Sequence, residues 1–121
     1  MKAALLCLAL VACGASASQR QTTLQAALVT TDTACDAFAA YDLKHQHDLV
    51  ADVRAKGGNQ ASAEAAVATW RVASQPAWMA CKSAYRAIAA AGTVTDDQSL
   101  KAIKAAGGIL ADALIALGVK L

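Results

Sequence analysis

The chain has 121 residues, enough for a single domain, and 57% of them are hydrophobic. Alanine alone accounts for 33 residues, whereas aromatic residues make up 4% and charged residues 17%. Alanine is the strongest helix former, and the β-branched and aromatic clusters that strands prefer are scarce. We therefore expect neither a β-sandwich nor a doubly wound sheet. A net charge of +2 is too small to indicate a nucleic-acid partner.

Residues 1–12 have the pattern of a secretory signal peptide. Lys2 supplies a positive charge near the start, and an apolar run from Ala3 to Ala12 follows it. This run is too short to span a bilayer as a helix, which needs about 20 residues. It is followed directly by a cysteine, so that the segment 10–13 reads Leu-Val-Ala-Cys.

This segment resembles the lipobox of bacterial lipoproteins, in which an aliphatic residue stands three positions before an obligatory cysteine. The resemblance implies cleavage before Cys13, attachment of diacylglycerol to its thiol, and acylation, typically with palmitate, of the new N-terminus. It also implies a lipid-anchored protein of the cell envelope that faces the periplasm or the exterior. Gly14 stands where an aspartate often signals retention in the inner membrane, which favours the outer membrane. Small lipoproteins of this kind occur in bacterial genomes and in phages or mobile elements.

Two alternatives remain for this segment. Residues 15–17 read Ala-Ser-Ala, which matches the cleavage site of an ordinary signal peptide, and an uncleaved signal would itself be an anchor. Residues 13–23 are otherwise rich in Ser, Ala, Gln and Thr and show no apolar period. We predict that they form the lipidated cysteine and a flexible tether, and that the helical domain spans residues 24–121.

Three apolar stripes with helical spacing predict an all-α fold. They span residues 23–55, 63–88 and 100–117, and the first ends at a Gly-Gly-Asn sequence. We predict an antiparallel helical hairpin plus a third helix, which together make a three-helix bundle.

Local signals mark the ends and the weak point of these helices. Pro76 lies inside the second stripe and predicts a kink or a break near Ser74. Residues 95–98 read Thr-Asp-Asp-Gln and fit a capping box at the start of the third helix. Gly118 has the position of a C-cap at its end.

The four cysteines divide into two groups. Cys7 leaves with the signal peptide and Cys13 takes the lipid, which leaves Cys35 and Cys81 in an exported, oxidising setting. These two lie equally far from Gly58 and at the middle of their stripes, so an antiparallel hairpin brings them to the same height. We predict a disulfide that joins the first two helices. Two separate buried thiols are the alternative.

Opposite charges on one flank of the hairpin follow nearly the same register. We predict that they form ion pairs, which add little stability but support the alignment of the two helices. The pairs are Asp32 with Arg86, Asp36 with Lys82, and Arg54 with Glu64.

Polar residues interrupt the apolar stripes at one level. Asp42, Gln46 and Ser74 point into the predicted interface, and Arg71 lies one turn from Ser74. We predict a buried polar network around an Asp42–Arg71 salt bridge that fixes the register of the helices.

A metal site is the alternative at this level. Asp42 and His45, with Asp48 or Asp52, would supply the imidazole and carboxylate groups that suit Zn²⁺, Cu²⁺ or Ni²⁺. The chain has no pair of histidines one helical turn apart, so these residues are weak candidates and we expect no metal.

The remaining residues and motifs of the sequence favour a protein without catalytic activity. The residues Phe38, Trp70, Trp78 and Tyr85 have helical spacing and are more typical of a core than of a ligand groove. We found no nucleophile motif, phosphate loop or zinc motif, so we expect no catalytic residues and no cofactor. The sequence predicts a tethered helical bundle that acts as a structural or protein-interaction module with another envelope protein. The alternative is a periplasmic helical protein that binds a metal or a small ligand.

Overall fold

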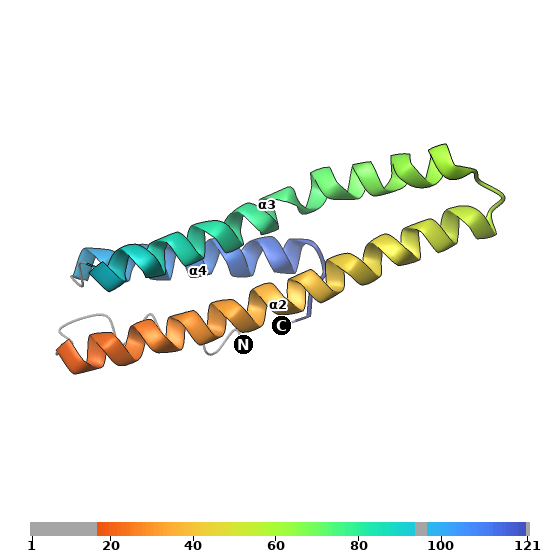
Figure 1. Ribbon diagram of the computed structural model, residues 1–121. Coiled ribbons are helices and arrows are strands. Elements are labelled where there is room, and N and C mark those ends of the chain that lie inside the picture. Colours follow the sequence, from red (N-terminus) through yellow and green to blue (C-terminus); the bar gives the residue numbers. More distant parts are fainter. Residues whose placement is uncertain (1–16, 94–96, 121) are drawn as a thin grey trace.

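A computed structural model describes residues 17–93 and 97–120, and all regular structure within these ranges is helical. The helices are α2 (Ala17–Ala55), α3 (Gln60–Thr93) and α4 (Asp97–Ala116). Helices α2 and α3 form an antiparallel hairpin, while α4 packs along α3 and touches α2 (Figure 1). The predicted hairpin plus third helix is therefore confirmed. The signal peptide, Cys13 and the predicted N-cap Thr95 lie outside the described residues.

Helix α2 begins earlier than the sequence pattern indicates. Residues 17–23 were predicted to belong to a flexible tether, but they form the first turns of α2. The Thr23 hydroxyl donates to the carbonyl oxygen of Gln19 at 2.8 Å, and the Arg20 guanidinium forms an ion pair with Asp97 of α4 at 3.0 Å. The tether prediction for these residues is wrong, because they are helical and one of them contacts α4 although the segment has no apolar period of its own.

The turn between α2 and α3 closes both helices with hydrogen bonds. Gly57 has a φ of +80°, and the N–H of Gly58 donates to the carbonyl oxygen of Val53 at 2.8 Å. This arrangement is a glycine C-cap. The Asn59 side chain accepts from the backbone N–H of Ser62 at 2.9 Å and so caps the start of α3. The predicted end of the first helix is thus confirmed.

Helix α4 ends as predicted at a glycine cap. Gly118 has a φ of +82°, a conformation that residues with side chains rarely adopt. The N–H of Val119 then donates to the carbonyl oxygen of Leu114 at 3.0 Å. The reversal of the chain directs the Val119 side chain back into the core, where it is buried.

Helix α3 is continuous through Pro76. A break near Ser74 was one of the two outcomes predicted for this proline, and it is absent. Pro76 is exposed, so the helical hydrogen bond that it cannot donate lies at the surface. Ala77 and Ala80, which follow Pro76 in the helix, are buried in the core.

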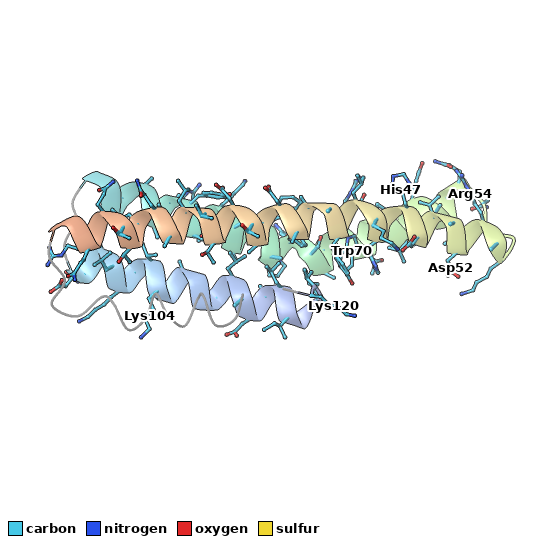
Figure 2. All side chains as sticks on the ribbon, turned by 90° about the horizontal axis from the view of Figure 1, so that it is seen from below. His47, Asp52, Arg54, Trp70, Lys104 and Lys120 are labelled. Carbon is cyan, nitrogen blue, oxygen red and sulfur yellow. A yellow bond between two sulfur atoms is a disulfide. The ribbon has the colours of Figure 1, made fainter. Side chains whose placement is uncertain are left out.

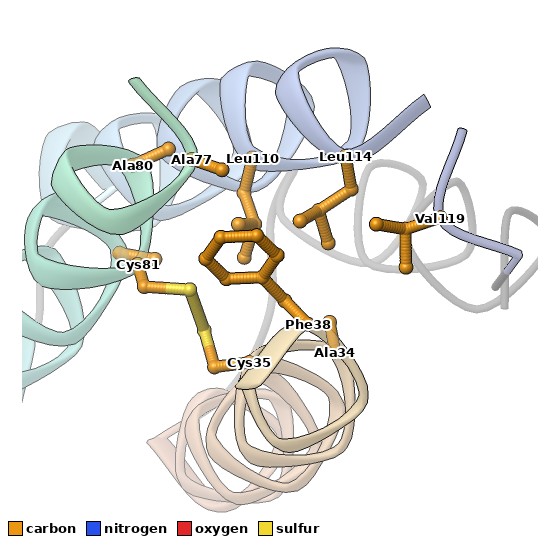
Figure 3. Close-up of a cluster of buried hydrophobic side chains, with 10 residues drawn as sticks. Ala34, Cys35, Phe38, Ala77, Ala80, Cys81, Leu110, Leu114 and Val119 are labelled. Atoms are coloured by element: carbon orange, nitrogen blue, oxygen red, sulfur yellow. A yellow bond between two sulfur atoms is a disulfide. The ribbon is translucent and has the colours of Figure 1, made fainter. Parts of the chain in front are cut away.

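The larger core cluster is centred on Phe38, which is fully buried. Its ring lies between the Cys35–Cys81 disulfide and the aliphatic side chains at the end of α4 (Figure 3). Small residues on the facing surfaces of α2 and α3 allow these helices to approach closely. They are Ala34, Ala77, Ala80 and Ala84.

The smaller core cluster lies at the other end of α4. It joins the start of α2, the end of α3 and the start of α4 through Leu24, Ala27, Ala91, Leu100 and Ile103. Both clusters lie where α4 covers the hairpin. No helix in residues 17–93 or 97–120 is long and apolar enough to cross a membrane.

The hairpin extends beyond the end of α4. Residues 43–55 of α2 and 60–73 of α3 form a two-helix projection, which we call the arm (Figure 1). Within it Ala63 and Trp70 are buried, whereas Leu49, Val53 and Val67 are only partly buried. The arm therefore lacks the third layer that completes the rest of the bundle.

Candidate functional site

The predicted disulfide between Cys35 and Cys81 is confirmed. The two Cα atoms are 6.1 Å apart, within the ~7 Å that a disulfide requires. Both residues are buried, and the bond closes a loop with a sequence separation of 46. It joins α2 to α3 inside the larger core cluster and fixes the register of the hairpin.

The predicted polar layer lies between α2 and α3, next to this cluster. Asp42 is only 9% exposed, and its Oδ2 accepts a hydrogen bond from Gln46 Nε2 at 3.1 Å. Ser74 is 1% exposed, and its hydroxyl donates to the carbonyl oxygen of Arg71 at 3.3 Å. Asp42, Gln46 and Ser74 are therefore brought to the interface, as expected.

The predicted salt bridge from Asp42 to Arg71 is wrong. The Arg71 side chain is exposed, and Asp42 Oδ1 instead accepts from Trp70 Nε1 at 2.6 Å. One step along a helix rotates a side chain by about 100°, so Trp70 faces α2 while Arg71 faces solvent. A buried indole N–H needs an acceptor. This requirement is a sequence signal that would have favoured Trp70 over its neighbour, and the prediction did not use it.

Rings from α2 stack on Trp70 at the C-terminal end of α4. His45 lies with its ring centroid 4.0 Å from that of Trp70, and Tyr41 stacks on His45 at 5.7 Å with an interplanar angle of 10°. The Tyr41 hydroxyl donates to the carbonyl oxygen of Leu117 at 3.1 Å. These contacts close the core where α4 ends, near the position of Lys120 (Figure 2).

The candidate metal ligands are engaged elsewhere. His45 packs between aromatic rings, while Asp48 pairs with Lys44 at 2.6 Å and Asp52 pairs with Lys56 at 2.9 Å. Across the part of the chain that the structure describes, no group of three or more His, Cys, Asp or Glu side chains is placed to hold a metal ion. The geometry therefore does not support the metal alternative at Asp42 and His45.

The four aromatic residues of the apolar stripes do not share a groove. Phe38 packs edge-on against Trp78 at a centroid distance of 4.7 Å. Trp70 is bonded to Asp42, and the Tyr85 hydroxyl donates to Asp32. These side chains act within the hairpin or at its flank rather than around a common cavity.

The three ion pairs predicted across the hairpin do not form within the described chain. Asp32 instead accepts a hydrogen bond from Tyr85, and Glu64 accepts one from Gln60 Nε2 at 3.0 Å. Asp32 is thus reached by the Tyr85 hydroxyl rather than by Arg86, and Glu64 is bonded along its own helix. Six charged side chains thus remain without an ion-pair partner among the described residues: Asp32, Asp36, Arg54, Glu64, Lys82 and Arg86.

The hydrogen bond to Asp32 raises the pKa of Tyr85 to about 12, and burial and the negative charges of Asp32 and Asp36 act in the same direction. An unfolded tyrosine titrates at about 10. The stabilisation that this bond provides is therefore fully present below pH ~10 and is lost as the pH rises towards 12.

We expect the Asp32→Asn variant to titrate Tyr85 at lower pH, towards the ordinary value of about 10. Tyrosinate absorbance measured against the Tyr85→Phe variant isolates the signal of this residue. Asp36→Asn is the control and should shift the midpoint less, because Asp36 acts only through its charge. An unchanged midpoint in Asp32→Asn would contradict the assignment.

The arm carries a shallow groove between its two helices. Leu43, Val50 and Val67 line it with His47 and Arg54, and Leu43 is 61% exposed. An adjoining depression towards the turn is lined by residues that include Gln60, Glu64 and Arg71. His47 and Arg54 lie on the side of the molecule away from α4 (Figure 2). The groove is thus aliphatic at its centre, charged at its rim and accessible to a partner.

No family model, curated protein or solved structure matches this chain. Three features are therefore available to support a function: the disulfide, the polar layer at Asp42, and the groove of the arm. The first two hold α2 and α3 together. The groove is the feature that is exposed to another molecule.

Proposed function

We propose that the protein is a non-enzymatic lipoprotein of the bacterial cell envelope, whose helical bundle acts as a structural and interaction module outside the membrane. The main support for this proposal is a disulfide-linked hairpin that follows closely on a lipobox-like segment ending at Cys13. A disulfide persists in an exported protein and is rare in the cytosol. The bond and the signal segment therefore support the same compartment.

Helix α4 covers only one half of the hairpin, and this supports the proposed role in binding a partner. Helix α4 buries the half of the hairpin that contains both core clusters, whereas the arm exposes aliphatic groups such as Leu43. Two helices alone cannot bury all of their apolar surface, and domains usually add a further layer. A partner that lies on the arm would supply that layer.

Lipidation at Cys13 is the first test of this proposal. We expect labelled palmitate to enter the full chain in an exporting bacterial host and Cys13→Ser to abolish the label. Several acyl chains, each contributing ~0.8 kcal/mol per buried CH₂, anchor a protein stably, so the labelled chain should be found in the membrane fraction. Labelling and membrane fractionation measure the two effects separately.

Cys7→Ser is the matched control, because Cys7 lies in the same signal segment but outside the lipobox. It should keep the label. A mature N-terminus at Ser18 would show cleavage after the Ala-Ser-Ala site and would refute the lipid anchor, while leaving the helical bundle unaffected.

A further inference from the structure

We propose that the side of the hairpin opposite α4 binds a second copy of this chain. The two hairpins then form a four-helix bundle around a two-fold axis that runs parallel to the helices. This inference rests on the interaction role proposed above and names its partner. It does not depend on the lipid anchor.

This surface, the open face, is formed by one flank of each long helix. On α2 it contains Leu43 and Arg54, which line the groove, and Asp36, which is seven residues before Leu43 and hence on the same flank. On α3 it contains Val67 of the groove and Arg71 of the adjoining depression, and Trp78 follows Arg71 by seven residues. The full set also includes Asp32, Val50, Glu64, Lys82 and Arg86.

The charges of the open face are arranged in opposite order on the two helices. Along α2, the acidic Asp32 and Asp36 lie in the half covered by α4 and the basic Arg54 lies near the turn. Along α3, basic residues lie at the height of the two aspartates, and the acidic Glu64 lies near the turn. The Cys35–Cys81 disulfide fixes these heights. Each charge on α2 therefore has an opposite charge at its own level on α3.

A two-fold axis parallel to the helices places α2 of one copy over α3 of the other without changing any height. Asp32 then faces Arg86 of the second copy, Asp36 faces Lys82, and Arg54 faces Glu64. Each of these pairs forms twice because the interface is symmetric. None of them forms within one chain, so the charges are available for this purpose.

Apolar side chains occupy the middle of the same face. Leu43 is 61% exposed and Trp78 is 40% exposed, while Val50 and Val67 form the floor of the groove. On α2, Asp36, Leu43 and Val50 of this face recur at seven-residue steps. This spacing is typical of four-helix bundles, in which neighbouring helices cross at about 20°. A second copy would cover these side chains and leave the charged pairs at the rim.

The charge order favours a second copy over an unrelated helical partner. An unrelated protein would need its own matching charges, whereas a copy of this chain already carries the complementary order. The parallel two-fold axis also brings both α2 N-termini to the same end of the dimer. Two chains held in one membrane by their N-terminal segments can therefore form it.

The test places a photo-crosslinking amino acid at Leu43 in the full chain, expressed in an exporting host. We expect an adduct of twice the mass of the chain. Ile109 on α4 is the matched control, because it is 62% exposed but lies away from the open face. Equal yields from the two positions, or adducts from Leu43 that contain only other proteins, would overturn the proposal.

Charge reversal then tests the pairing. Asp36→Lys and Lys82→Asp should each lower the yield of dimer about tenfold, because two attractive pairs become repulsive. Differently tagged copies of the two variants, expressed together, should restore the adduct, since the lysine introduced in one chain then faces the aspartate introduced in the other. Such a rescue can arise only between chains. If it fails while both variants remain helical by circular dichroism, the pairing is refuted.

The outcome is separable from that of the lipidation experiment. The crosslinking series is repeated with Cys13→Ser, in which an adduct is still expected when the chain is concentrated. Absence of palmitate labelling from the chain with Cys13 intact, with retention of the adduct, would contradict the lipid anchor alone. Retention of labelling without an adduct would contradict the dimer alone.

Discussion

Reduction of the Cys35–Cys81 disulfide is expected to lower the Tm by more than about 10 °C. Closing a loop with a sequence separation of 46 contributes ~4 kcal/mol in the chain-entropy model. A domain of this size shifts its Tm by ~4–8 °C per kcal/mol. The loss is large because total stabilities are typically ~5–15 kcal/mol, and the alanines of this core bury little area each. Thermal unfolding followed by circular dichroism, with and without reductant, measures the shift.

The double variant Cys35→Ser/Cys81→Ser is the control for this prediction. It should melt at the lower temperature whether or not reductant is present. Thiol titration of the denatured Cys7→Ser/Cys13→Ser protein provides a direct check, because only Cys35 and Cys81 then remain. Two titratable thiols in the absence of reductant would show that the disulfide is not formed.

Replacing Trp70 by Phe is expected to destabilise the fold by ~1.5–3 kcal/mol, because it removes the N–H that donates to Asp42. Of the two side-chain donors to the buried carboxylate, the Gln46 amide alone would then remain. Denaturant unfolding measures the change. Trp78→Phe is the matched control, since Trp78 is 40% exposed and packs on Phe38 through its ring.

A double-mutant cycle separates this hydrogen bond from the loss of packing. Asp42→Ala combined with Trp70→Phe should show a coupling energy of ~0.5–3 kcal/mol. The same cycle with Arg71→Ala in place of the Trp70 variant should show almost none, because Arg71 is exposed and not bonded to Asp42. Coupling to Arg71 but not to Trp70 would reverse the assignment of the partner.

The helices and their alignment were predictable because several local signals agree. The apolar stripes, the glycines at the helix ends and the equal spacing of Cys35 and Cys81 from Gly58 all favour the same antiparallel hairpin. The first turns of α2 were not predictable in this way. They have no apolar period, and their ion pair with α4, Arg20–Asp97, joins residues that lie far apart in the chain.

The polar contacts were harder to predict than the helices. The stripe identified Asp42 as buried, but a choice between adjacent donors on α3 requires the rotation of that helix to within less than one residue step. The three ion pairs predicted on the flank join residues that are level in the register, but none of them forms among the described residues. Register shows which residues are level, but it does not show whether their side chains meet.

The early start of α2 changes the distance over which this protein would act. Only three residues lie between Cys13 and Ala17, and the four steps along the chain span at most ~13 Å. Helix α2 then continues for 39 residues, which corresponds to ~58 Å. In a lipid-anchored chain, the turn at Gly57 would thus stand as far as ~70 Å from the bilayer. A long helix, rather than a flexible linker, would then determine how far from the membrane the arm lies.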